Sequence, residues 1–313
     1  MTLEEGALHL YTCLGKSLLT LRDLAKHGCR RSEHVRAKIN RWISSNKRNR
    51  FWQSDAEEET WKALLQPFGH LEAYLGGGSF GTVFKATRRG RPVAIKLTPY
   101  VPSAWGSLGH ASEYEMQKRF AALGLAFMPI CARNRKAMAG EGLKLKGSLR
   151  EILRFNVGGI VMPIVEGTLV DICRRGHVAG LQDAVTSLLR AARVGGMVHN
   201  DLKCNNVGYL LSPMLDIRYL DLARSYDVAT LQDKGHSPED AEQLVAMGVA
   251  LDSMCLLASA RRHLAAGNRG MTQVTAAAEM HLLELGYRDN DDDAVRKLNA
   301  RVSFCLYKKP QKG

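Results

Sequence analysis

Long apolar runs are missing from this chain of 313 residues. No uninterrupted stretch approaches the ~20 apolar residues that a helix needs to cross a bilayer, so we expect no transmembrane helix and no membrane partner. The N-terminus, MTLEEGALHLYTCLGK, places acidic residues before apolar ones, which is the reverse of a secretory signal. We therefore expect an intracellular protein of the cytoplasm, the nucleus or both.

Cysteine pairs with metal-site spacing are also absent. The seven cysteines are odd in number, scattered along the chain and include no CxxC. This pattern argues against a disulfide framework and against a zinc site, and it favours reduced thiols. With 45% hydrophobic residues, the chain can still bury a substantial core.

Acidic residues are few relative to basic ones, with 31 Asp and Glu against 44 Lys and Arg, a net charge of +13. Much of the excess lies in residues 15–50, which hold eleven basic and two acidic residues. Such a segment suits nucleic acid, nuclear targeting or an acidic partner. It has few aromatic residues to stack on bases, which weakens the nucleic-acid interpretation. A solvated basic helix face explains it equally well.

Periodicity and turn signals divide the chain into three regions. Residues 1–68 have apolar residues at helical spacing and predict a basic helical extension. Residues 69–166 alternate glycine-rich turns with β-branched runs and predict a β-hairpin within 71–98, joined at RRGRP, and a helix over 111–124. Residues 167–313 are mostly helical, and short strands flank the segment HNDLKCNN. The pattern predicts an α+β fold with a small β-rich lobe and a larger α-rich lobe.

Four helices are expected in the third region. Apolar periodicity places them at residues 168–175, 181–194, 238–262 and 271–286. One further strand is expected before them, in the run GGIVMPIV at residues 158–165.

A glycine-rich stretch opens the second region. In LGGGSFGTV, Gly76, Gly78 and Gly81 fit the pattern GxGxxG. Glycine allows positive φ and lets backbone N–H groups approach phosphate oxygens. The β-branched residues that follow predict a strand, whereas a dinucleotide fingerprint runs into a helix. We therefore expect a hairpin that covers phosphates.

Lys96 ends the apolar strand VAIK. A lysine in such a strand is costly without an anionic partner, so it either faces phosphates or is an edge lysine whose amine reaches solvent. The helix predicted next offers Glu113 or Glu115 as the partner of the amine. We favour Glu113, because Met116 and Phe120 then follow it on one core-facing stripe.

The segment HNDLKCNN holds Asp201, Lys203 and Asn206 within a few positions, and YLDLARS adds Asp221 after a short apolar strand. Phosphoryl transfer needs these groups. A carboxylate accepts the proton of the attacking hydroxyl, an amide and a carboxylate hold Mg²⁺, and a cation offsets the charge of the moving phosphoryl group. Catalysis of this kind depends on a few residues in rigid positions.

With these four segments in order, the chain resembles a eukaryotic-type protein kinase over about residues 71–262. The resemblance implies a bilobal fold, with residues 69–166 as the small lobe and 167–313 as the large lobe. It also implies ATP and Mg²⁺ as cofactors and transfer to serine or threonine hydroxyls of protein substrates, because Lys203 is typical of the serine/threonine branch.

The resemblance further implies roles for single residues. Asp201 would be the catalytic base, Lys203 would contact the γ-phosphate, and Lys96, paired with Glu113, would anchor the other phosphates. Asn206 and Asp221 would bind Mg²⁺. The nucleotide-binding residues would be Leu75, Gly76, Gly78, Ser79, Phe80, Gly81, Val83, Ala94, Lys96, Met162 and Val165.

Several positions depart from the family pattern. Asn200 replaces an arginine that often clamps a phosphorylated activation loop, and Ala223 replaces the glycine of DFG. Gly208 stands where the family usually has an apolar floor under adenine. The segment at 246–254 resembles the central helix of the large lobe, but Gln243 stands at its usual aspartate position.

The activation segment between Asp221 and that helix is also short, and SPED at 237–240 is at best a remnant of a substrate-binding motif. Two alternatives to a protein kinase therefore stay open. One is a pseudokinase that acts as a nucleotide-binding or interaction scaffold, and the other is a kinase of small molecules.

Overall fold

The computed structural model describes residues 66, 68–78, 81–100, 110–135, 156–211 and 214–287. The basic segment 15–50 and nearly all of the expected helical extension lie outside these residues. The chain divides into two compact units. Unit 1 is Met1–Tyr114 with Pro129–Ile164, and unit 2 is Glu115–Met128 with Val165–Gly313.

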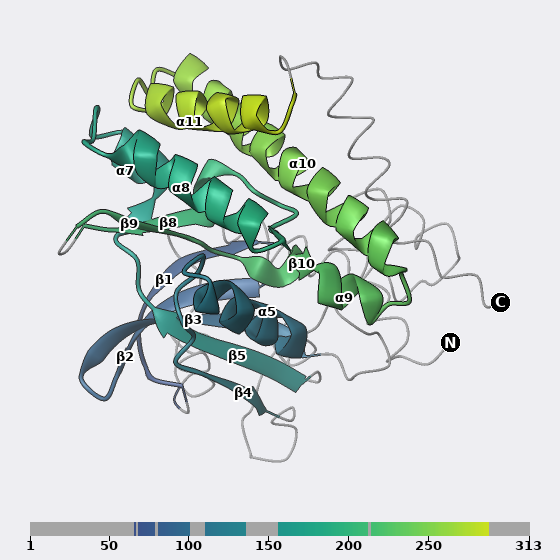
Figure 1. Cartoon of the computed structure of the whole chain (residues 1–313). Helices are drawn as coiled ribbons and strands as arrows, with labels where there is room; N and C mark the ends of the chain where they lie inside the picture. The colour runs from purple at the N-terminus through teal and green to yellow at the C-terminus, as the bar shows by residue number, and fades with distance from the viewer. Residues whose placement is uncertain are drawn as a thin grey trace, which may run out of the picture. The chain divides into compact units, whose positions relative to one another are not determined.

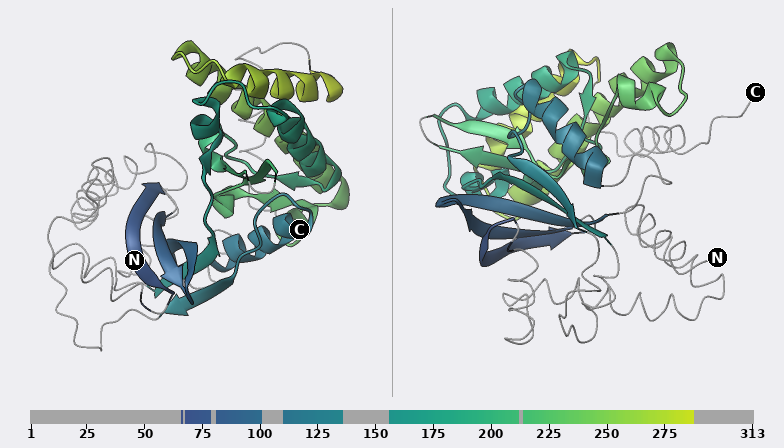
Figure 2. Two further views of the ribbon diagram at one scale, coloured as in Figure 1. Left: turned by 90° about the vertical axis from the view of Figure 1, so that its left-hand side faces the viewer. Right: turned by 90° about the horizontal axis from the view of Figure 1, so that it is seen from below.

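Unit 1 is built on a five-stranded sheet in the order β1-β2-β3-β5-β4, in which every neighbouring pair is antiparallel (Figure 1). The strands are β1 (His70–Gly78), β2 (Gly81–Arg88), β3 (Arg91–Tyr100), β4 (Cys131–Arg135) and β5 (Asn156–Pro163). Figure 2 shows the same sheet from two further sides. The predicted strand at 158–165 is confirmed as β5, whereas β4 was not predicted.

The predicted hairpin at RRGRP is also confirmed, as the connection of β2 to β3. Arg88 pairs with Arg91, and the two residues between them, Arg89 and Gly90, have φ of 51° and 74°. Two consecutive residues with positive φ are typical of the tight turn whose twist matches that of antiparallel strands. Glycine takes the second of these positions without a steric cost.

One face of the sheet carries a continuous apolar layer across the three central strands. Phe84 on β2, Ile95 on β3 and Val161 on β5 are register partners across the three central strands, and all three are buried. Side chains that are register partners stand on the same side of a sheet, so these residues form one continuous layer. The alternate residues of β3, including Lys96, therefore face the opposite side.

Helix α5 (His110–Ala122) follows β3 and crosses the unit boundary after Tyr114. The predicted helix at 111–124 is thus confirmed to within two residues at its end. Its stripe residues Met116 and Phe120 are both buried, as the apolar spacing predicted.

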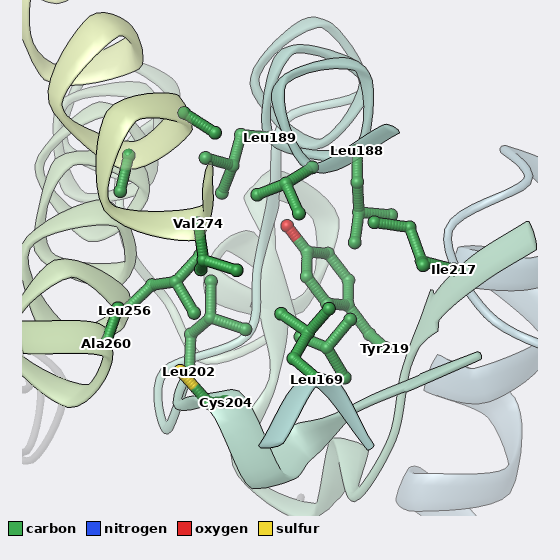
Figure 3. Close-up of a cluster of buried hydrophobic side chains, with 14 of the residues drawn as sticks. Leu169, Leu188, Leu189, Leu202, Cys204, Ile217, Tyr219, Leu256, Ala260 and Val274 are labelled. Carbon is green, nitrogen blue, oxygen red and sulfur yellow. The ribbon is translucent and has the colours of Figure 1, made fainter. Parts of the chain in front are cut away.

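Unit 2 is mainly helical. Its helices are α7 (Leu169–Cys173), α8 (Leu181–Val194), α9 (Val228–Gln232), α10 (Pro238–Ala265) and α11 (Met271–Glu284). The four predicted helices are confirmed as α7, α8, α10 and α11. Helices α8, α10 and α11 pack on one another around a buried cluster to which Leu189, Leu256 and Val274 contribute (Figure 3).

Short strands complete unit 2. Strands β6 (Gly167–Thr168), β8 (Val207–Leu210) and β9 (Asp216–Tyr219) form one sheet, and β7 (Met197–Val198) pairs with β10 (Tyr226–Asp227) in another. Two 3₁₀ turns, at Cys204–Asn206 and Leu222–Arg224, lie beside them. The expected α+β class is confirmed for the part of the chain that the structure describes.

Helix α10 begins at SPED. The Ser237 side chain accepts a hydrogen bond from the backbone N–H of Asp240 at 3.1 Å, and Pro238 occupies the first helical position. Both are ordinary helix-start features. Within the described residues, α10 has the length and apolar composition of a membrane-spanning helix, but 72% of its most apolar window is buried inside the protein. A core helix of this length has the same properties.

Candidate functional site

In unit 1, Lys96 forms an ion pair with Glu113. The Lys96 Nζ contacts Glu113 Oε1, and the two side chains are only 6% and 5% exposed. Glu115, the alternative partner, is exposed and pairs with Lys118 at 2.7 Å. The predicted choice of Glu113 is therefore confirmed. A buried pair of this kind makes each partner dependent on the other, because loss of one leaves an uncompensated charge.

The face of the sheet that carries Lys96 also carries three of the residues predicted to bind a nucleotide. Val83 is the register partner of Lys96, and Ala94 is the partner of Met162. Lys96 and Ala94 are two residues apart on β3, so all four share one face. The sheet thus places an apolar strip beside a charged amine.

The predicted glycine hairpin is described in part. Gly76 pairs with Val83, and Gly78 pairs with Gly81 at the end of β1 and β2. Leu75 is the extra residue between the pairs of Tyr74 and Gly76, a β-bulge, and its side chain is 49% exposed. Ser79 and Phe80, at the tip, lie outside the described residues.

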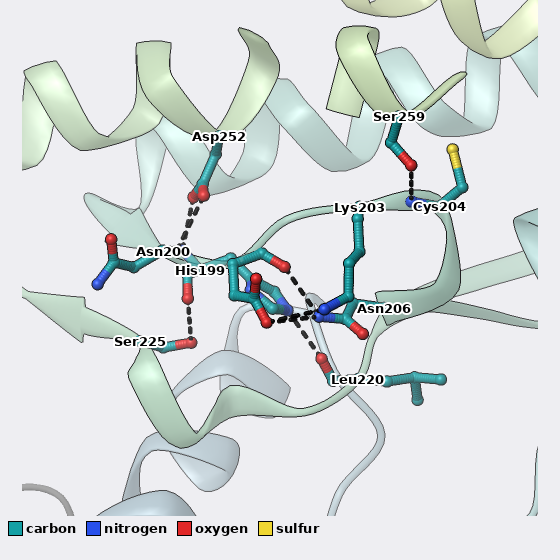
Figure 4. Close-up of polar contacts among 10 residues, drawn as sticks. His199, Asn200, Lys203, Cys204, Asn206, Leu220, Ser225, Asp252 and Ser259 are labelled. Carbon is teal, nitrogen blue, oxygen red and sulfur yellow. Dashed lines mark hydrogen bonds and ion pairs between the residues drawn. The ribbon is translucent and has the colours of Figure 1, made fainter. Parts of the chain in front are cut away.

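In unit 2, the loop after β7 brings Asp201, Lys203 and Asn206 together. Figure 4 labels Lys203 and Asn206 in this loop. Lys203 Nζ lies 3.0 Å from Asp201 Oδ2. Asn206 is buried, and its Nδ2 donates to the Asp201 backbone carbonyl at 2.8 Å and to Asp201 Oδ2 at 3.3 Å. The predicted acid, cation and amide are therefore in direct contact.

Asp221 is brought to the same place by the β8–β9 hairpin. Val207 pairs with Tyr219, and the N–H of Leu220 donates to the Asn206 carbonyl at 2.8 Å. Asn206 and Asp221 therefore flank the same end of the hairpin. Asp221 has φ of 58° and ψ of 62°, a left-handed conformation that is uncommon outside glycine and recurs at functional sites.

Asp252, on α10, holds the backbone of the loop. Its carboxylate accepts hydrogen bonds from the N–H groups of His199 at 2.6 Å and Asn200 at 2.9 Å (Figure 4). Burial raises the pKa of this carboxyl to about 7, although the N–H donors of His199, Asn200 and Leu202 oppose the rise. The resemblance placed the helix's usual aspartate position at Gln243, whereas the α10 acid that contacts this loop in the structure is Asp252.

His199 ties the loop to the strand that leads to Asp221. It is buried, its Nε2 lies 2.7 Å from the Leu220 carbonyl, and its ring meets Tyr219 edge to face. Burial lowers the pKa of the imidazole. The ring is then neutral, with the Nε2 proton donated to Leu220. Neither His199 nor Asp252 was predicted as a site residue. For His199, the one signal in the sequence was its position at the head of HNDLKCNN.

Asn200, the second left-handed residue of the site, contacts the segment after Asp221. Its φ is 60°, and its Nδ2 donates to the Arg224 carbonyl at 3.3 Å. Ser225 adds a second link, because its hydroxyl donates to the His199 carbonyl at 3.1 Å. The loop and this segment are therefore connected through side chains as well as through the pairing of β7 with β10.

The predicted site residues divide between the units. Those of the sheet, from Leu75 to Met162, belong to unit 1, whereas Val165 and the loop residues belong to unit 2. Among the described residues, no group of three or more His, Cys, Asp or Glu is arranged to hold a metal ion. The predicted magnesium ligands are one amide and one carboxylate and do not need such a group.

Comparisons with known proteins return neither a matching protein-family model nor a matching curated protein.

Proposed function

We propose that the chain transfers the γ-phosphoryl group of ATP, with Mg²⁺, to serine or threonine hydroxyls of protein substrates, as protein kinases do. One observation carries the proposal: Asp201, Lys203, Asn206 and Asp221 gather at one end of the β8–β9 hairpin. Under this proposal, unit 1 and unit 2 correspond to the small and large lobes of a bilobal kinase fold.

The exposure and contacts of Asp201 support the role of a general base. Its side chain is 26% exposed, so a substrate hydroxyl can reach the carboxylate. The Asn206 amide and the Lys203 amine orient this carboxylate from two sides. Asp201 would accept the hydroxyl proton, while Lys203 would offset the negative charge of the phosphoryl group in transit.

The donor set at the hairpin end fits Mg²⁺. Because the Asn206 Nδ2 donates to Asp201, its Oδ1 is the atom that would bind a cation, and Asp221 would supply a carboxylate oxygen. Mg²⁺ prefers such oxygen ligands, and it commonly uses one or two carboxylates together with water and substrate phosphates. When bound, the ion would neutralise charge on the phosphates.

Unit 1 would hold the nucleotide. Lys96, held in place by Glu113, would contact the phosphates, as would backbone N–H groups of the hairpin that contains Gly76, Gly78 and Gly81. The apolar side chains of Val83, Ala94 and Met162, on the Lys96 face of the sheet, would contact the base.

A second candidate, a nucleotide-binding scaffold without transfer activity, is favoured by the segment between Asp221 and α10. This segment consists of one 3₁₀ turn, the two-residue strand β10 and the five-residue helix α9. A substrate peptide therefore has little chain to bind in this region. A kinase of small molecules would tolerate the same shortening.

Phosphoryl transfer from labelled ATP distinguishes these candidates. The full chain is incubated with Mg²⁺, labelled ATP and a generic basic protein, and in a parallel reaction without added substrate. We expect label on protein, and we expect Asp201→Asn to lower the rate by about 10³-fold, because a general base contributes on this scale.

Asp216→Asn is the matched control. Asp216 is the acid at the opposite end of the same hairpin, where it pairs with Arg218 at 2.9 Å, and its replacement should leave the rate unchanged. If wild type and Asp201→Asn bind ATP but neither transfers label, the scaffold is correct. Transfer to small metabolites alone would identify the third candidate.

A further inference from the structure

Two loops meet at one end of unit 2, the turn between α7 and α8 and the loop between α10 and α11. A Cβ built on Gly270 would lie 2.2 Å from the Cys173 carbonyl oxygen and 2.6 Å from that of Gly176, so the two backbones are in close contact. The Gln273 side chain adds two hydrogen bonds, because it accepts from the Val178 N–H at 3.0 Å and donates to the Val178 carbonyl at 2.8 Å. The loops therefore form one continuous surface.

This end of unit 2 is rich in exposed arginine. The exposed arginines are Arg174, Arg175, Arg262 and Arg269. Arg262 lies in the last turn of α10, and the others lie in the two loops. Arg174 pairs with Asp171 at 3.4 Å, whereas the other three form no ion pair within the residues that the structure describes. We call these three, Arg175, Arg262 and Arg269, the basic surface.

Two guanidinium groups of the basic surface are held in place. The Arg175 guanidinium lies over the Tyr209 ring, 5.6 Å from the ring centroid, in a cation–π contact, and Tyr209 is fully buried. Arg262 Nε donates to the Ala258 carbonyl at 3.3 Å. A side chain that is already held loses less entropy when it binds a partner, so these cations are arranged in advance to receive an anion.

Arg262 connects the basic surface with the loop that carries Asp201. Ser259, three residues earlier on α10, accepts a hydrogen bond from the Cys204 N–H at 3.2 Å (Figure 4). Residues three apart on a helix are neighbours, so Arg262 lies beside Cys204. Burial raises the pKa of the Cys204 thiol, and the positive charge of Arg262 opposes this rise. Lys203, the neighbour of Cys204, contacts Asp201, so the cations continue to the site of the proposed transfer.

We propose that the basic surface binds acidic side chains that flank the acceptor serine or threonine of the protein substrate. The inference rests on the proposed function, since it places the acceptor hydroxyl at Asp201. A guanidinium can hold a carboxylate through two parallel hydrogen bonds, so arginine suits aspartate and glutamate. Nucleic acid is also anionic, but the basic surface contains no aromatic side chain on which a base could stack.

The test compares two synthetic peptides that share one acceptor serine, flanked by glutamates in one and by glutamines in the other. We expect kcat/KM of the full chain to favour the glutamate peptide by about tenfold. Arg175→Gln, Arg262→Gln and Arg269→Gln should each lower that preference by about two- to threefold, mainly through KM, because each removes one ion pair. Arg193→Gln is the matched control. It removes an exposed arginine at the other end of α8 and should not change the preference.

Binding is measured separately, by fluorescence anisotropy of the two peptides with alanine in place of the serine. Equal affinity of the full chain for both peptides, or equal affinity of the arginine variants and the wild type for the glutamate peptide, would overturn the basic surface even where transfer occurs. Arginine-dependent binding of the glutamate peptide without transfer to either serine peptide would support the basic surface and overturn the proposed function. A single-stranded oligonucleotide that binds these arginines more tightly than the glutamate peptide would overturn the acidic partner in favour of nucleic acid.

Discussion

Among the described residues, each unit contains one deeply buried acid, and the surroundings of the two acids differ. In unit 1, Glu113 is paired with the amine of Lys96. In unit 2, Asp252 accepts hydrogen bonds from backbone N–H groups of the loop that carries Asp201. The first carboxylate is paired with a full positive charge, whereas peptide dipoles offset the burial of the second only in part.

The two acids therefore have different structural roles. A buried ion pair holds the lysine side chain in one position, and its two side chains can be replaced only together. A carboxylate that accepts several backbone N–H groups fixes the conformation of the chain instead, because each unmade hydrogen bond would leave a buried donor unsatisfied. Glu113 thus positions a side chain, whereas Asp252 positions a loop. Variants of the two buried acids and of one further ion pair should differ in stability, and their expected effects run from the largest to the smallest.

Breaking the unit 1 pair should have the largest effect. Lys96→Ala removes the cation that pairs with the buried carboxylate of Glu113, so we expect a loss of about 3–5 kcal/mol in the free energy of unfolding, measured by urea denaturation. Lys96→Met combined with Glu113→Leu removes both charges and should be more stable than Lys96→Ala. Equal losses in the single and double variants would show that the two side chains are not coupled.

Removing the unit 2 acid should cost somewhat less. Asp252→Ala leaves the N–H groups of His199 and Asn200 without their acceptor, and we expect a loss of about 2–4 kcal/mol in the same measurement. Asp252→Asn keeps one carbonyl oxygen and should cost less than the alanine variant. If alanine and asparagine behave alike, the hydrogen bonds do not account for the role of Asp252.

The pH dependence of stability should separate the two acids. Because burial raises the pKa of Asp252 from 3.8 to about 7, the folded protein holds this proton more tightly than the unfolded chain. The contribution of this proton to the free energy of unfolding is therefore complete below about pH 4. It falls as the pH rises towards 7, by up to about 1.4 kcal/mol per pH unit. Asp252→Asn should flatten this part of the curve. Urea denaturation from pH 4 to 8 measures both proteins, and parallel curves would contradict the prediction.

The partly exposed ion pair of Arg119 with Asp227 in unit 2 should have the smallest effect. Arg119 Nη1 lies 2.8 Å from Asp227 Oδ2, and Asp227 also caps α9 by accepting from the Thr230 N–H at 2.7 Å. Arg119→Ala should cost less than about 1 kcal/mol of unfolding free energy, and Asp227→Ala more, because it also removes the cap. Thermal unfolding of the two variants compares them directly. A larger loss from Arg119→Ala would reverse this order.

Much of the local structure follows from local patterns. Apolar periodicity places α8 at Leu181–Val194 without error, and it places the start of α10 correctly at Pro238. The stripe formed with Met116 and Phe120 correctly selects Glu113 over Glu115. These predictions succeed because helix face, helix start and hairpin turn depend on residues within a few positions of one another.

The long-range part of the site was not predictable in this way. Asp252 reaches His199 from a helix that comes later in the chain, and no periodicity in α10 indicates which of its residues faces the loop. Leu220 fills the space above Gly208 because two strands pair in one particular register. Both contacts depend on how whole elements pack and not on the sequence around either residue.

The sequence by itself therefore determined the longer helices and the β2–β3 hairpin of the described residues. It also determined the chemical groups available to a site: an acid, an amine, an amide and a second acid at known positions. Only the tertiary structure decided which buried acid supports the loop and which apolar side chains lie beside it. The physical reason is distance along the chain. Local patterns act over one or two turns, whereas hydrogen bonds and packing join residues that the sequence separates by tens of positions.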